Sequence, residues 1–319
     1  MRDRLREALD RLREVRDEPD SPGRRREIAK ALGDKNNYVV GSAADIVAKE
    51  SIDGLDDALE SAFRRFMENP IKRDPGCKAK LAVIEALRST SPYATDVFLQ
   101  GIHHIQLEPA WGKPVDTATS LRSVSAFALV ESLHPDALLH VADLLADENA
   151  HCRSAATQAA AAAPHTIAAA SLLRFKLHIG DREPEVIGHC MDGLLSIARE
   201  SSFELIAGYL DGPDSILAEN AALSLGTTRS PEAFDVLRRW WERTVRLDVR
   251  ALGLVAISLI RDADSRDFLI EIVARGEEVD ALDAVKALEL YRHDDEVWAG
   301  VEAAAAGNTS AVLAASRSE

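Results

Sequence analysis

The chain has 319 residues, of which 46% are hydrophobic but only 5% aromatic, so a core must be built mainly from Ala, Leu, Val and Ile. Its 53 acidic residues outnumber 38 basic ones, and the formal net charge of −15 disfavours binding to nucleic acid or to an anionic membrane. No apolar run approaches the roughly 18 residues of a membrane span, and the charged N-terminal segment lacks the apolar stretch of a secretory signal, so a cytoplasmic location is expected.

A charged segment opens the chain. Residues 4–16 have the composition of a helix, and Glu-Pro-Asp-Ser-Pro-Gly at 18–23 ends it. We expect residues 1–23 to cap the first apolar face of the helical region after residue 23. At the other end, residues 295–319 are expected to form a second cap, with a helix over 296–306 and a tail over 310–319.

Between the caps, over residues 24–294, one pattern recurs: a polar or small residue that opens an Ala/Leu-rich segment. Another amphipathic segment precedes each copy, as at 137–147 and 266–276. This periodicity predicts an all-α fold without strands, an α-α superhelix in which about eight helical hairpins stack as one solenoid over residues 1–319. The copies begin at Gly41, Lys80, Arg122, Arg153, Gly188, Glu219, Arg250 and Asp283, with separations of 39, 42, 31, 35, 31, 31 and 33 residues.

An aspartate and an arginine mark the start of several second helices, in Asp116-Thr-Ala-Thr-Ser-Leu-Arg122, Asp147-Glu-Asn-Ala-His-Cys-Arg153 and Leu247-Asp-Val-Arg250. These segments resemble the HEAT family, specifically the short bacterial HEAT-like repeats first named for phycobiliprotein lyases. The resemblance covers residues 24–290 and implies a binding scaffold of the armadillo type. It also implies that the aspartate caps its helix and that the arginine reaches an aspartate of a neighbouring repeat.

The two longest separations, 39 and 42 residues, contain inserts at 66–78 and 106–117. In a solenoid, the loops within successive hairpins emerge on one edge about 10 Å apart, so these loops are expected to be neighbours. We predict that they form a rim pocket that includes Lys72. The candidate binding residues there are Arg73, Asp74, His104, Glu108, Trp111, Lys113, Asp116 and Arg122.

Helical projection separates two faces just before the second insert. Phe98, Ile102 and Ile105 fall on one stripe and are expected to be buried, whereas His104 and Glu108 would face each other four residues apart. With His103 they offer two or three metal ligands, but no HExxH motif or third ligand is evident, so no metal or cofactor is predicted.

The role of Trp111 is open from sequence alone. It is either an anchor that contacts a ligand or partner, since aromatic residues dominate interface hot spots, or a plug that packs the loop onto the helices. Cys77, Cys152 and Cys190 do not fall at one repeat position and are expected to be small buried hydrophobes.

One basic and aromatic stretch, residues 238–250, resembles the cationic groove of HEAT-like DNA glycosylases. The residues that carry this resemblance are Arg239, Trp240, Trp241, Arg243, Arg246 and Asp248. The acidic net charge argues against this interpretation. The alternative is a solvated helix with one buried tryptophan.

No complete catalytic, metal or nucleotide motif occurs in the chain. The sequence therefore predicts a non-enzymatic scaffold that binds a protein partner, of basic or mixed surface charge, through its concave face or the rim at 66–78 and 106–117. The alternative is a protein that handles a small-molecule ligand or cofactor, like a lyase or chaperone, in a pocket between those loops.

Overall fold

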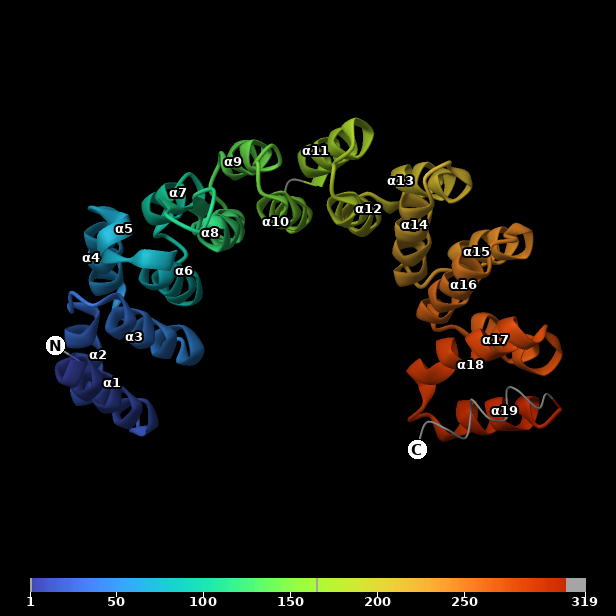
Figure 1. Ribbon diagram of the computed structural model, residues 1–319, viewed down its shortest axis with the longest axis horizontal. Helices are drawn as coiled ribbons and strands as arrows, with labels where there is room; N and C mark the ends of the chain where they lie inside the picture. The colour runs from blue at the N-terminus through green and yellow to red at the C-terminus, as the bar shows by residue number, and fades with distance from the viewer. Residues whose placement is uncertain (1, 165, 308–319) are drawn as a thin grey trace. The chain divides into compact units, whose positions relative to one another are not determined.

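The computed structural model describes residues 2–164 and 166–307, and in these residues nearly all regular structure is helical (Figure 1). The chain divides into two compact units, Met1–Leu172 and Leu173–Glu319. Each unit is built from helical hairpins in which a first helix is followed, after a turn, by a second one. None of the described helices is both long enough and apolar enough to cross a membrane.

The first unit begins with α1 (Arg2–Asp17), which packs on the first hairpin through the buried side chains of Leu12 and Val15. Four hairpins follow. They are α2 (Pro22–Leu32) with α3 (Asn37–Glu50), α4 (Asp56–Met67) with α6 (Lys78–Thr90), α7 (Thr95–Ile102) with α8 (Thr119–Glu131), and α9 (Ala137–Leu144) with α10 (Ala150–Ala161). The long loop between α4 and α6 holds α5 (Pro70–Arg73) and the short 3-10 helix η1 (Pro75–Cys77).

The second unit repeats this plan after α11 (Thr166–Ile179), the helix that contains the boundary between the units. Its further elements are α12 (Pro184–Ile197), α13 (Arg199–Ala207), η2 (Gly208–Asp211), α14 (Ser215–Thr227), α15 (Pro231–Arg243), α16 (Leu247–Ile260), α17 (Ala263–Arg275), α18 (Glu278–Leu288), η3 (Glu289–Tyr291) and α19 (Asp295–Ala305). The last helix packs on α17 and buries Trp298 and Val301. The tail expected over residues 310–319 lies outside the described residues.

Every predicted copy of the repeat opens within a second helix, in α3, α6, α8, α10, α12, α14, α16 and α18. Within the first unit α3, α6, α8 and α10 pack in that order, and within the second α12, α14, α16 and α18 do the same. Small residues allow this close packing. A Cβ added at Gly226 of α14, for example, would lie 2.2 Å from the carbonyl oxygen of Ala256 in α16. The prediction of helical hairpins packed in sequence order is confirmed, while one solenoid through the whole chain stays a prediction.

Two local predictions were wrong. The expectation of no strands fails at β1 (Leu107–Glu108) and β2 (Val115–Asp116), which pair antiparallel with Leu107 opposite Asp116. The helix before them, α7, ends at Ile102, so Ile105 is 63% exposed instead of lying on the buried stripe of Phe98 and Ile102. A further turn would bond the amide of Gln106 to Ile102 O, but this amide donates instead to Asp116 Oδ1 at 3.1 Å.

The cysteines agree with their predicted role. Cys77, Cys152 and Cys190 are free thiols, and all three are buried. Burial raises the pKa of Cys77 to about 11 and that of Cys190 to about 12, so neither thiol is a reactive nucleophile at neutral pH.

Candidate binding edge at the β1–β2 hairpin

The inserts 66–78 and 106–117 contact each other, as their lengths and positions predict. The amide of Gly76 donates to Glu108 Oε1 at 2.6 Å, and the Gln106 side chain donates from Nε2 to the carbonyl oxygen of Asp74 at 2.9 Å. Cys77 Sγ and Thr117 Oγ1 are 3.9 Å apart. The α4–α6 loop therefore supports the base of the β1–β2 hairpin.

The interior of this junction is filled by a buried ion pair. Asp74 and Lys80 are both fully buried, with Asp74 Oδ2 3.1 Å from Lys80 Nζ. Asp74 also accepts hydrogen bonds from the amides of Ala79 and Lys80 and from Asn37 Nδ2, at 3.0 to 3.1 Å. Lys80 Nζ donates in turn to Gln106 Oε1 at 3.0 Å. A carboxylate so enclosed and so fully bonded cannot line an open pocket, and Asp74 is therefore a structural residue.

Glu108 serves the same structural purpose at the hairpin base. Its Oε1 accepts hydrogen bonds from Gly76 N, Gln106 Nε2 and Thr117 Oγ1 at 2.6 to 2.7 Å. Burial acts to raise the pKa of this carboxyl, but the three hydrogen bonds outweigh burial and hold the pKa below its usual value.

The expected contact between His104 and Glu108 does not form. α7 ends before His104, and the imidazole Nε2 instead lies 3.1 Å from Gln106 Oε1. Burial lowers the pKa of His104. His103 contacts a histidine of the next hairpin, with Nε2 3.0 Å from His140 Nδ1. Among the described residues, no three His, Cys, Asp or Glu side chains are placed to hold a metal ion.

Asp116 and Arg122 connect the hairpin to the helices. Asp116 Oδ1 accepts hydrogen bonds from the amides of Gln106 and Ala118, and its Oδ2 lies 2.7 Å from Arg122 NH1. The buried guanidinium also donates from Nε to Asp147 Oδ2 of the next repeat at 2.9 Å. The predicted reach of an arginine to a neighbouring repeat's aspartate is thus observed here, and it recurs between Arg250 and Asp280 at 2.6 Å.

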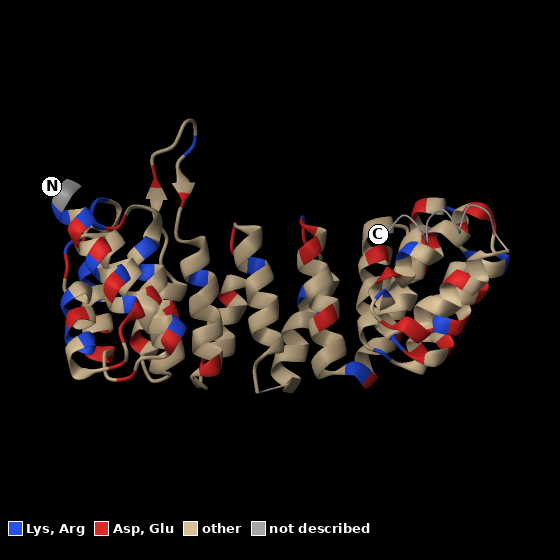
Figure 2. Ribbon diagram, turned by 90° about the horizontal axis from the view of Figure 1, so that it is seen from below, with Lys and Arg blue, Asp and Glu red and all other residues tan. Residues whose placement is uncertain are grey.

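The tip of the hairpin, by contrast, contacts little of the chain. Residues 109–114 are all exposed, and Figure 2 shows the hairpin standing out from the helices around it. Trp111 has 107% of its reference surface accessible, so the plug interpretation is wrong. Gly112 follows it with φ +103°, a backbone conformation that favours glycine and sets the turn that presents the indole.

The remaining exposed residues of this edge are basic or apolar. Lys72 and Lys113 are exposed and form no ion pair within the described residues, while Arg73 pairs with Glu68 at 2.7 Å. Leu107 and Val115, one on each strand, are 55% and 53% exposed. The structure thus separates the candidate residues into a buried set that builds the edge and an exposed set that can contact a partner.

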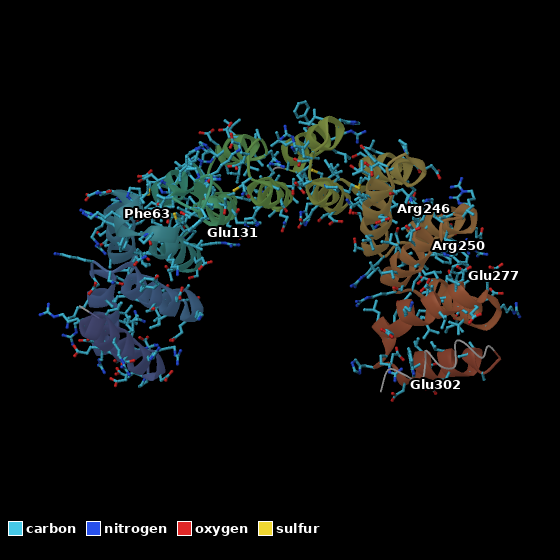
Figure 3. The ribbon with its side chains drawn as sticks, in the orientation of Figure 1. Phe63, Glu131, Arg246, Arg250, Glu277 and Glu302 are labelled. Atoms are coloured by element: carbon cyan, nitrogen blue, oxygen red, sulfur yellow. The ribbon has the colours of Figure 1, made fainter. Side chains whose placement is uncertain are left out.

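The basic and aromatic stretch at 238–250 is arranged differently from a base-binding groove. Trp240 and Trp241 are both buried, where one buried tryptophan was expected. Trp240 Nε1 donates to Leu210 O at 2.9 Å. The guanidinium carbon of Arg250, a residue labelled in Figure 3, lies 4.0 Å from the ring centroid of Trp241. Arg246 pairs with Asp248 at 2.6 Å. No stacking surface is therefore offered to a nucleotide base at this point.

Sequence reasoning missed the roles of Lys80 and Gln106 in the network under the hairpin, whereas Asp147 was among the aspartates that the repeat resemblance singles out. A signal for Lys80 exists in the spacing. An aspartate precedes a basic residue by six positions in Asp74/Lys80, Asp116/Arg122 and Asp147/Arg153. Gln106 has no such signal, because its role depends on the fold of the loop around it.

No protein-family model matches the chain, and no curated protein matches it in sequence.

Proposed function

We propose that this chain is a non-enzymatic scaffold of HEAT-like repeats that binds a protein partner through the edge carrying the β1–β2 hairpin, with Trp111 as the anchor. The observation that carries the proposal is the position of Trp111, fully exposed at the tip of a hairpin whose base is fixed by part-buried hydrogen bonds.

Two features support HEAT-like repeats. Arginines that open second helices pair with aspartates of the following repeat, as in Arg122/Asp147 and Arg250/Asp280. An aspartate side chain also accepts the amide two residues later at the entrance of several second helices. This turn occurs at Asp34, Asp116, Asp147, Asp181 and Asp214.

An exposed tryptophan is well suited to anchoring a partner. A tryptophan side chain buries on the order of 200 Å² when it is covered, and interface hot spots are enriched in it. The hairpin base is already held by Gln106, Glu108, Asp116 and Thr117, so binding orders few further groups. Binding of a protein partner would therefore bury the indole at a small cost in conformational entropy.

The alternatives have weaker support. A ligand pocket between the loops needs open space, but Asp74, Lys80 and Gln106 fill the junction. A glycosylase-like groove needs accessible aromatic side chains, but Trp240 and Trp241 are buried.

Photocrosslinking in the cells from which the protein comes tests the proposal. A benzoylphenylalanine at position 111 should give a discrete protein adduct, whereas the same group at Tyr93, another exposed aromatic of this unit, should not. Replacing residues 109–114 by Asn-Gly keeps the opposed pair Glu108 and Val115 around a two-residue turn. That variant should remain folded and fail to capture the partner in a pull-down, as should Trp111→Ala. Equal adducts at both positions, or none, would count against the proposal.

A further inference from the structure

We infer that the partner segment bound at this edge is acidic and carries an aliphatic or aromatic residue. The inference rests on the proposed function and names the partner's chemistry. The inserts 66–78 and 106–117 contain equal numbers of acidic and basic residues. In the structure, the acidic side chains form ion pairs or hydrogen bonds within the chain, whereas the basic ones are exposed.

The carboxylates of the edge are used to build it. Asp74 is fully buried beside Lys80, and Asp116 pairs with the buried Arg122. Glu108 accepts three hydrogen bonds on one oxygen. Glu68 is exposed but pairs with Arg73 at 2.7 Å. Three of the four are paired with a cation, and Glu108, which has no ion pair within the described residues, is engaged by three hydrogen bonds.

The lysines of the edge remain at the surface. Lys72 on α5, Lys78 at the start of α6 and Lys113 at the hairpin tip are exposed, and none forms an ion pair within the described residues. Lys78 Nζ lies 4.8 Å from the ring centroid of Tyr38, which is itself 49% exposed. The edge therefore presents cations in a chain whose formal net charge is −15.

Apolar groups lie on the β1–β2 hairpin with Lys113 and on α5 with Lys72. Trp111 is fully exposed, Leu107 and Val115 are each more than half exposed, and Ile71 is 47% exposed beside Lys72. A segment that combines carboxylates with an apolar side chain complements both features, because ion pairing and burial of the indole can be satisfied together.

The charge of the rest of the chain restricts the form of this segment. Exposed charges more than about 8 Å apart are largely screened at physiological salt, so the lysines attract carboxylates only at close range. A large acidic surface would also face the acidic remainder of the chain, whereas a short acidic segment meets only the edge. The acidic segment inferred for this edge differs from the basic or mixed partner expected from the net charge, and that expectation stays a prediction for the rest of the surface.

Peptide display tests the inference. A random twelve-residue library is selected on the full-length protein, and the enriched peptides are measured by fluorescence anisotropy. We expect enrichment in Asp and Glu together with Trp, Phe, Leu or Ile, and a loss of affinity of about tenfold or more on Trp111→Ala.

Matched charge variants separate the edge from the overall field. Lys72→Glu/Lys113→Glu should lower the affinity for the selected peptides by about tenfold or more. The control Lys30→Glu/Lys49→Glu changes the net charge equally, at exposed sites outside this edge, and should leave the affinity within about twofold of the wild type.

The outcomes distinguish the two proposals. Peptides that depend on Trp111 but are neutral or basic, or that bind equally to both charge variants, would overturn the acidic partner and leave the proposed binding edge standing. Peptides that ignore Trp111→Ala, or no enrichment at all, would overturn both.

Discussion

Arg122 and Asp147 lie in successive repeats and are joined by a hydrogen-bonded ion pair, with Arg122 Nε 2.9 Å from Asp147 Oδ2. The same guanidinium is 2.7 Å from Asp116 Oδ2 at the base of the hairpin. Because the arginine side chain is only 4% exposed, one buried cation compensates two carboxylates. Arg122 therefore links the stacking of α8 on α10 to the placement of the β1–β2 hairpin.

Substitution of Arg122 should accordingly destabilise the chain. Arg122→Met keeps an apolar stem but leaves Asp116 and Asp147 without their cation, and we expect the free energy of unfolding to fall by about 2 to 4 kcal/mol. Arg64→Met breaks an exposed pair with Glu60 on one helix and should lower it by no more than about 0.5 kcal/mol. Urea denaturation measures both. Similar losses for the two variants would show that Arg122 is not a structural bridge.

Acid should weaken the hairpin base. Hydrogen bonds to Asp116 from two amides and from Arg122 overcome the effect of burial and hold its pKa below the usual 3.8, and the pKa of Glu108 lies below 4.5. Both carboxyls have lower pKa values in the folded chain than in the unfolded chain. Their ionised forms therefore stabilise the fold fully above the unfolded-state pKa values near 4, and this stabilisation is lost as the pH falls through the folded-state pKa values. Urea denaturation of Asp116→Asn should show lower stability at pH 7 and a shallower decline below pH 4. An unchanged decline would exclude Asp116 as a contributor.

The buried pair of Asp74 and Lys80 should behave as a coupled unit. Lys80→Met leaves a buried carboxylate without its cation, and we expect a loss of about 3 to 5 kcal/mol in the free energy of unfolding. Adding Asp74→Asn removes that charge and should restore a large part of the loss. A double-mutant cycle by chemical denaturation measures the coupling. Strictly additive effects would mean that the two groups do not stabilise each other in solution.

The sequence predicts the repeats and the adjacency of the inserts because both depend on spacing. Copies that begin at Lys80 and Arg122 are separated by 42 residues where most neighbours are 31 to 35 apart, and the excess has to lie in a loop. The Asp-to-Arg pattern predicts a cross-repeat ion pair for the same reason.

Neither the β1–β2 hairpin nor the burial or exposure of its side chains could be predicted from spacing. Strands of two residues have no detectable period, and whether Trp111 packs or protrudes depends on the space left by the helices beneath it. Trp240 and Trp241 are both buried because neighbours lie on two sides of α15. Trp240 Nε1 donates a hydrogen bond to Leu210 O in η2, and Trp241 packs edge to face on Phe268 of α17, with the ring centroids 5.5 Å apart.

Close helix packing in the second unit makes Gly226 sensitive to a single methyl group. A Cβ there would lie 2.2 Å from Ala256 O, a backbone atom that cannot move without shifting α16. We expect Gly226→Ala to lower the free energy of unfolding by about 1 to 3 kcal/mol despite the better helix propensity of alanine. Gly208→Ala, where no atom lies within 4 Å, is the control and should change it by less than about 0.5 kcal/mol. A neutral Gly226→Ala would contradict the close approach of α14 and α16.

Trp111 should dominate the solvent-exposed part of the intrinsic fluorescence. The other three tryptophans, Trp240, Trp241 and Trp298, are only 4%, 6% and 7% exposed, so acrylamide should quench mainly Trp111. Trp111→Phe should therefore remove the red-shifted, quenchable emission and leave the free energy of unfolding within about 0.5 kcal/mol of the wild type, because the side chain is fully exposed. Trp298→Phe is the control that should retain the quenchable component. If quenching of the wild type is weak and increases on dilution, the indole is covered by a second copy of the chain, and the partner proposed for the edge would have to compete with it.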